Sequence, residues 1–486
     1  MWSATFWPDF CEMIAMKNTY LPLLLFVASI TTVFSQQLVL KKGEIIDSLP
    51  VQDSTNTTYS LYLPTNFNTE TKWPLMVVFD MDGKEKQAMS MFVVAAEKEG
   101  YILASPKMID SLSLTKNVLA SSRVVEKVAN LFPVDPNRVY TAGASKAGRF
   151  ASLIPVLMDG VKGVMTIGAS LANRELLNIK EPFHFIGMVN KNDFNYTSML
   201  TDAKLLDKLK FPNQVLLFDA NGEWPGVDYI QKGMQLFTLD AMGRSLIPKD
   251  SIIISSSFKK DLDKVNQLKN RGDLLWAEQY LTEMMSIYGA HKNLDSLRNV
   301  QKELRRDKQY REMNRAENAV FLKESILKED FQYYMEEDFY THNFNNLGWW
   351  TYQMGELQKY INSAKPLEQQ MGHRLLGFVN ALAEDNIDLV LSEAALDEDA
   401  LAFLYMLKTI LEPDNFEYYL NTISLSAKNE DFGTSLFYLE EVLKKGFKDK
   451  EKLYGLEGTA LLRITPEFNE LVAKYLDDAR YLIEKN

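Results

Sequence analysis

Between residues 37 and 247, short apolar runs rich in branched side chains alternate with stretches of helical periodicity. The inner runs LMVVFD, GVMTIG and FHFIGMV are almost continuously apolar, as is typical of strands buried on both faces of a sheet. Two early extended runs followed by this alternation predict an α/β domain with a mostly parallel sheet that helices cover on both sides. The expected strands are 37–41, 59–63, 75–80, 102–105, 139–142, 163–168, 183–189 and 215–219, and the expected helices are 86–99, 119–131, 146–158, 197–209 and 228–242.

After about residue 250 the strand-like runs end, and the chain becomes charged, helical and poor in proline. We therefore place a domain boundary at 246–254 and predict an all-α domain over 255–486. Two of its stretches show a large residue, a small residue three positions later and another large residue four positions after that. These stretches carry Leu274, Ala277 and Leu281, and Phe432, Ser435 and Leu439. The spacing resembles the second half of a tetratricopeptide repeat, and an irregular helical domain without true repeats is the alternative.

The bulk composition excludes several classes of protein. A length of 486 residues suggests two or three domains. The net charge of -12 argues against binding to a nucleic-acid backbone, which requires a basic face. The single cysteine, Cys11, forms no intramolecular disulfide and lacks the paired spacing of a zinc site. The sequence predicts neither a metal nor a cofactor.

The N-terminus has the pattern of an export signal. Residues 16–35 contain one cation, an apolar run and small residues at a cleavage site, so we predict a signal peptide with Gln36 as the first mature residue. The apolar run 20–34 is shorter than the roughly 20 residues of a membrane span, although an uncleaved anchor is the alternative. Residues 1–15 carry acidic side chains where a signal peptide has cations, which suggests that translation begins at Met16. The expected location is the periplasm or the outside of the cell, with no stable membrane span after cleavage.

The sharpest motif is VYTAGASKAGRF, residues 139–150. A short apolar strand ends at Gly143, Ser145 follows two residues later, and Ala147 and Gly148 precede an apolar helix. Small neighbours allow the tight strand-to-helix turn that exposes a nucleophile at the carboxyl end of a sheet. Ser145 would also lie at a helix N-terminus, whose amides favour negative charge.

Residues 40–245 contain the stretches LYLPTNF, WPLMVVFDMDG, VDPNRVYTAGASKAG, NKNDFNY and FDANGEWPG. Through these stretches they resemble secreted bacterial α/β hydrolases of the esterase and polyhydroxyalkanoate-depolymerase type. The resemblance implies Ser145 as the nucleophile and Asp193 as the acid. It also implies an oxyanion site at the amide of Lys146 and a loop amide near Asp82. The family's histidine position holds Gly222, so the expected base is missing. A carboxylate at Asp82 would oppose an oxyanion, unless it only caps the following turn.

None of the four histidines is an evident replacement for the base. His291, His342 and His373 fall in the helical half, and His184 lies inside an expected buried strand, where a packed core residue is the simpler interpretation. Lys146 is adjacent to Ser145, and adjacent helical residues do not face each other. A serine without its base is a poor nucleophile.

Two functions follow from this pattern. The favoured one is an exported binding protein with an inactive hydrolase domain over 37–247, which holds a small-molecule ligand or binds a protein partner through the helical domain. The alternative is an active secreted serine esterase that uses Ser145 and Asp193 with an unidentified base. The aromatic stretch at 343–350 is expected to be packing rather than a carbohydrate platform.

Overall fold

The computed structural model of the chain describes residues 40–51, 57–108, 113–219, 224–477 and 479–481. Residues 43–486 form one compact unit, and almost all of the preceding unit, residues 1–42, lies outside the described residues. The predicted start region 1–15 and signal peptide 16–35 therefore lie outside them too. Of the helices that the structure describes, none combines the length and the hydrophobicity that a membrane crossing needs.

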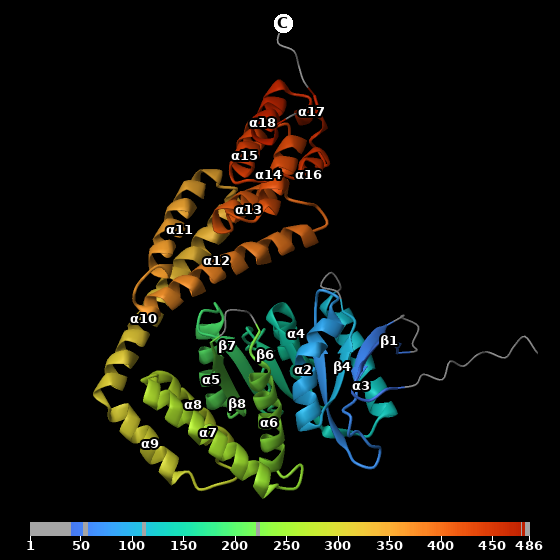
Figure 1. Ribbon diagram of the computed structural model, residues 1–486, viewed down its shortest axis with the longest axis vertical. Helices are drawn as coiled ribbons and strands as arrows, with labels where there is room; N and C mark the ends of the chain where they lie inside the picture. Colours follow the sequence, from blue (N-terminus) through green and yellow to red (C-terminus); the bar gives the residue numbers. More distant parts are fainter. Residues whose placement is uncertain (1–39, 52–56, 109–112, 220–223, 478, 482–486) are drawn as a thin grey trace, which may run out of the picture. The chain divides into compact units, whose positions relative to one another are not determined.

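The strands of the described residues form one eight-stranded sheet in the order β1-β2-β4-β3-β5-β6-β7-β8 (Figure 1). β2 is antiparallel to β1 and β4, and every other neighbouring pair is parallel. This mostly parallel sheet with its helical connections has the α/β-hydrolase fold, which confirms the predicted fold class. The strands are β1 (Ile45–Pro50), β2 (Thr58–Tyr62), β3 (Trp73–Phe79), β4 (Ile102–Pro106), β5 (Val134–Ala144), β6 (Val161–Ile167), β7 (His184–Asn190) and β8 (Asn213–Phe218).

The first predicted strand, 37–41, falls mostly outside the described residues, and the others are present with shifted ends. Residues 37–39 lie outside the described residues, residues 40 and 41 are not in a strand, and the sheet begins instead with β1. β1 is an edge strand of sequence IIDSLP with two exposed positions in its middle. An edge strand with solvent-exposed positions lacks the continuous apolar run of the inner strands. The search for such runs therefore did not predict β1.

Helices cover both faces of the sheet. The helices of this part are α2 (Glu85–Glu99), α3 (Leu114–Leu131), α4 (Ser145–Leu157), α5 (Tyr196–Leu209) and α6 (Val227–Gly243). Successive strand residues point to opposite faces, and β3 illustrates the result. Val78 belongs to one buried cluster with Phe92 of α2 and Phe237 of α6, whereas Phe79 packs edge-on against Phe150 of α4 with ring centroids 5.0 Å apart. Both faces of the sheet are buried, which explains why the sequences of the inner strands are continuously apolar.

The second half of the chain is helical. Its helices are α7 (Ser251–Arg271), α8 (Leu274–Tyr288), α9 (Asp295–Arg306), α10 (Lys308–Thr341), the short 3₁₀ helix η1 (Phe344–Asn346), α11 (Leu347–Ile361), α12 (Pro366–Ser392), α13 (Glu398–Leu411), α14 (Phe416–Lys428), α15 (Phe432–Lys444), α16 (Lys450–Tyr454), α17 (Ala460–Arg463) and α18 (Pro466–Leu476). Buried residues of α7–α9 belong to the same cluster as the sheet, so the helices just after the predicted boundary share the core of the α/β part. The boundary at 246–254 stays a prediction.

Two further cores stabilise the remaining helices. One joins α10–α13, and the other joins α14–α18. Ala277 and Ser435, the small residues of the predicted repeat spacing, are fully buried, and α8 packs on α7 as α15 packs on α14. Relation to tetratricopeptide repeats stays a prediction. Trp350 is completely buried and donates a hydrogen bond to Asp338, which confirms its packing role.

Candidate active site

The Ser145 turn has the strained geometry that the motif predicts. Ser145 follows β5 directly and begins α4 with a φ of 49°, a left-handed backbone conformation that is costly for a residue other than glycine. A Cβ on Gly143 would collide with the backbone of Ala147. A Cβ on Gly148 would lie 2.8 Å from the carbonyl oxygen of Gly143. The two glycines therefore permit the close approach of strand and helix that exposes Ser145.

Asp193 lies in the turn between β7 and α5, which we call the acid loop (residues 190–197). Its amide donates to the carbonyl of Asn190 (3.0 Å), and its Oδ1 accepts from the amide of Asn195 (2.8 Å). Asn195 in turn donates through its side chain to the carbonyl of Gly168 (2.9 Å), directly after β6. These contacts fix the carboxylate beside the end of the strand next to β5, so Ser145 and Asp193 line the same cleft.

The two predicted oxyanion positions differ in their surroundings. The amide of Lys146 is in the first turn of α4, where amides have no acceptor within the helix. The amide of Asp82 donates instead to the carboxylate of Asp80 (3.1 Å), which also accepts from the amide of Lys84. Asp80, rather than Asp82, thus caps this turn, and the Asp82 amide already has an acceptor within it.

Gly222, the predicted position of the base, lies outside the described residues, and a glycine has no side chain to accept a proton. His184 is fully buried at the start of β7, hydrogen-bonded to Gln214 and 3.7 Å from Asp240. Burial lowers the pKa of His184, with Asp240 opposing the shift. Ser145 follows the opposite ends of the strands, roughly 20 Å away for a strand of this length. The interpretation of His184 as a core residue is therefore confirmed.

The three imidazoles of the helical half do not belong to the described residues that line the cleft of Ser145. His291 hydrogen-bonds the carbonyl of Leu239 (3.0 Å), and His342 contacts the carboxylate of Asp397 (3.0 Å). His373 lies on α12 and does not line the cleft of Ser145 as the described residues define it.

Helix α12 forms the wall opposite the Ser145 turn. The cleft between them has a volume of about 590 Å³ and includes Gly377, Ala381, Glu384 and Asp385 of this helix. Two ion pairs cross from α4 to α12: Lys146 to Asp388 at 2.5 Å, and Arg149 to Asp385 at 3.8 Å. The pairs are about half exposed, so each contributes at most about 1 kcal/mol. They set the charge pattern of the cleft more than its stability.

The carboxylates on this wall have different electrostatic surroundings. Burial alone would raise the pKa of Glu384, but hydrogen bonds from Lys408 and Tyr418 outweigh it and lower the pKa. Lys408 itself is completely buried and also pairs with Glu412 at 2.7 Å. Burial raises the pKa of Asp385, with Arg149 and Lys146 opposing the shift. The pKa values of these two neighbouring carboxyls are thus shifted in opposite directions.

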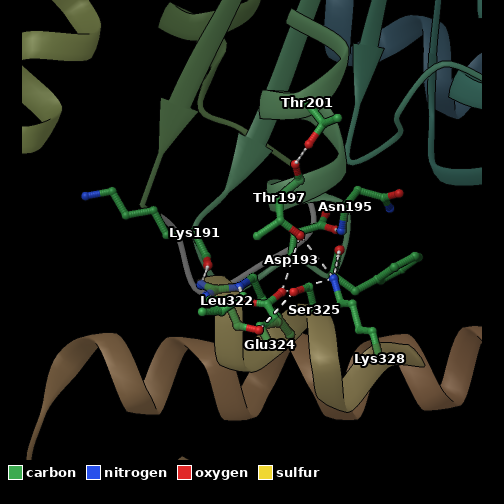
Figure 2. Close-up of polar contacts among 11 residues, drawn as sticks. Lys191, Asp193, Asn195, Thr197, Thr201, Leu322, Glu324, Ser325 and Lys328 are labelled. Carbon is green, nitrogen blue, oxygen red and sulfur yellow. Dashed lines mark hydrogen bonds and ion pairs between the residues drawn. The ribbon is translucent and has the colours of Figure 1, made fainter. Parts of the chain in front are cut away.

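A buried ion network attaches the acid loop to the helical half (Figure 2). Glu324 of α10 and Arg374 of α12 are each 1% exposed, and their closest atoms are 2.6 Å apart. Arg374 donates to the carbonyl of Lys191 (2.8 Å), and Lys328 donates to the carbonyl of Phe194 (3.1 Å) while pairing with Glu324 (3.0 Å). The loop that carries Asp193 is thus held by charged groups more than 120 residues away in sequence.

Sequence reasoning missed α12, its carboxylates and the network around Glu324. These side chains look like ordinary charged positions of amphipathic helices, and no local pattern relates them to Ser145. The described residues contain no cluster of three or more His, Cys, Asp or Glu side chains that could hold a metal ion.

Comparison with known proteins gives structural likeness only. No protein-family model matches the chain, and no curated protein matches it. Among solved structures, it is similar to FphF, a fluorophosphonate-binding serine hydrolase of Staphylococcus aureus, with 15% identity, 40% of this chain and 97% of that chain covered, and a TM-score of 0.33. Esterase B from Lactobacillus rhamnosis has 13% identity, with 49% and 98% covered and a TM-score of 0.35. Esterase 2 from Thermogutta terrifontis, phosphonylated by sarin, has 13% identity, with 43% and 96% covered and a TM-score of 0.33.

Values this low support no inference about activity. The sheet order and the Ser145 turn of this chain carry the fold assignment: an α/β-hydrolase fold over the N-terminal part, followed by a helical region.

Proposed function

We propose that this chain is a binding protein that keeps the cleft of a serine hydrolase and has lost its turnover. The observation that carries the proposal is the composition of the cleft. Ser145 opens into a volume of about 590 Å³ together with carboxylates and asparagines, and of the described lining residues none is a histidine. The cleft is large enough for a small organic ligand.

Ester hydrolysis needs an acceptor for the serine proton. A general base works best when its pKa lies near the operating pH, and an ordinary carboxylate lies several units below that. Loss of one member of a serine–histidine pair removes about a million-fold in rate in a well-studied protease. With Gly222 at the base position, the Ser145 hydroxyl is expected to hydrogen-bond a ligand rather than attack it.

A second candidate is a slow serine esterase with Asp385 as the base. Two observations favour it: the φ of 49° at Ser145 keeps the hydroxyl exposed, and Asp385 lines the same cleft with a pKa that burial raises. A carboxyl with a raised pKa is a better proton acceptor at neutral pH than an ordinary aspartate.

A fluorophosphonate probe distinguishes the two functions. We expect the wild type, like its Ser145→Ala control, to show no adduct at Ser145 and no turnover of p-nitrophenyl butyrate. A Gly222→His variant is expected to gain labelling at Ser145, because the acid and the nucleophile are retained. Robust labelling and turnover by the wild type, abolished in the Ser145→Ala variant, would refute the binding proposal. Loss of that activity in an Asp385→Asn variant would then assign the base.

Export is part of the proposal and rests on residues 16–35 alone. Expression of the chain in a bacterial host should yield a mature protein beginning at Gln36. An N-terminal sequence that retains residues 16–35 would contradict it.

A further inference from the structure

A second cavity lies on the other side of the acid loop. It has a volume of about 430 Å³ and is formed by β7–α5, α8, α10 and the start of α12. Lys191 and Tyr196 of the acid loop line it, while Asn192 to Asn195 line the Ser145 cleft. In Figure 2 the side chain of Lys191 extends away from the network of Glu324 and Lys328. The acid loop is thus a wall shared by two separate cavities.

The walls of this cavity are aromatic and acidic. Trp276 and Tyr310 contribute rings, and Asp273, Glu278 and Glu317 contribute carboxylates. The only lysine or arginine among its described lining residues is Lys191, whose ammonium lies 4.2 Å from the centre of the Trp276 ring. Aromatic faces attract cations by their quadrupole, so the position of Lys191 indicates that this ring accepts an ammonium group.

Two of the three carboxylates have no partner among the described residues. Glu278 is neutralised by Arg305, with Nε and Oε1 2.9 Å apart. The carboxylates of Asp273 and Glu317 make no hydrogen bond or ion pair with the described residues. Burial raises the pKa of Glu317, and Lys191 is the strongest of the nearby charges that oppose the shift. Arg374 and Lys204 also oppose the shift, but among the described lining residues of the cavity Lys191 is the one cation beside these two carboxylates.

We propose that this cavity binds an organic cation: a primary or quaternary ammonium on an apolar body, with Glu317 and Asp273 balancing its charge and Trp276 and Tyr310 contacting its body. The volume suits a ligand of small-molecule size. The site is distinct from the Ser145 cleft and does not depend on the function proposed there.

The position of Lys191 predicts the direction in which its substitution changes the affinity for a cation. Its ammonium already occupies the position over Trp276 and repels a second cation. Replacing it by methionine removes the nearer of two ammonium groups at this ring, since that of Lys264 lies 5.6 Å from the same ring centre. The contact from Arg374 to the carbonyl of Lys191 is made by the backbone and is retained. Lys191→Met is therefore expected to tighten binding, while Glu317→Gln is expected to weaken it.

The test is an NMR titration of the whole protein with phenethylammonium and benzyltrimethylammonium, and with 3-phenylpropionate as the anionic analogue. We expect both cations to bind and the anion not to bind. Glu317→Gln should weaken binding about tenfold or more, and Lys191→Met should strengthen it. Glu312→Gln, an exposed acid on the same helix, is the matched control and should leave binding unchanged, as should Ser145→Ala.

Four results would overturn the proposal: no cation binding at millimolar concentration, preference for 3-phenylpropionate, equal binding by wild type and Glu317→Gln, or loss of binding in Ser145→Ala. The last would place the ligand in the Ser145 cleft instead. Melting temperatures of the variants show that each is folded, so that a loss of binding reports the site.

Discussion

The buried network at the acid loop makes a quantitative prediction about its two central charges. Glu324 is held by two cations, Arg374 at 2.6 Å and Lys328 at 3.0 Å. An isosteric Glu324→Gln change removes the direct counter-charge of the buried Arg374 and of the partly buried Lys328. Removing one partner of a buried pair typically costs about 3–5 kcal/mol. We therefore expect Glu324→Gln to destabilise the protein by about 3–5 kcal/mol.

Arg374→Met should cost less, about 2–3 kcal/mol, although Arg374 is equally buried. Glu324 then keeps Lys328 as its partner, and the methionine fills much of the volume of the arginine stem. The losses are the two hydrogen bonds from Arg374 to Glu324 and the one to the carbonyl of Lys191. Glu324→Gln is therefore expected to destabilise the protein more than Arg374→Met because two cations contact Glu324, and not because of a difference in burial.

Urea denaturation followed by tryptophan fluorescence measures both costs, and hydrogen exchange locates them. The amides of Asn195 and Tyr196, which donate to Asp193, should exchange faster in Glu324→Gln than in Arg374→Met. Lys328→Met serves as the control for the second cation. Equal costs for the two variants, a larger cost for Arg374→Met, or costs below about 1 kcal/mol for both would refute the reasoning.

Three further predictions concern single side chains. Burial raises the pKa of Glu283 to about 8 from its ordinary 4.5, with the amide of Val215 opposing the shift. Protonation therefore stabilises the fold below pH 4.5, and this contribution is lost as the pH rises toward 8, by roughly 3 kcal/mol at pH 7. Unfolding of Glu283→Gln should show a flatter pH dependence than that of the wild type, and parallel curves would contradict the shift. Ser145→Gly should be about 1 kcal/mol more stable than Ser145→Ala in thermal melts, because glycine relieves the left-handed strain. Gly148→Ala should lower the melting temperature, since its Cβ would lie 2.9 Å from that of Ala169, and an unchanged value would argue against close packing at the turn.

Most of the sheet could be predicted from the sequence, because inner strands buried on both faces have a continuous apolar signature. β1 escaped prediction because half of it faces water. The Ser145 turn could also be predicted, since its small residues are spaced by the local geometry of a strand-to-helix bend. Asp193 was predicted in a different way, from the resemblance of NKNDFNY, just after an apolar strand, to the hydrolases.

The sequence by itself determined the α/β sheet and the turn with Ser145, and it predicts a glycine, Gly222, at the position of the base. These features depend on residue type and on periodicity over short stretches of sequence. Only the tertiary structure decided that α12 forms the second wall of the cleft, that Arg374 and Glu324 hold the acid loop, and that Lys191 lies over Trp276. Such contacts join residues about 50 to 240 positions apart. They depend on how helices pack, and a charged residue on a helix has the same local pattern whether it faces solvent or a buried partner.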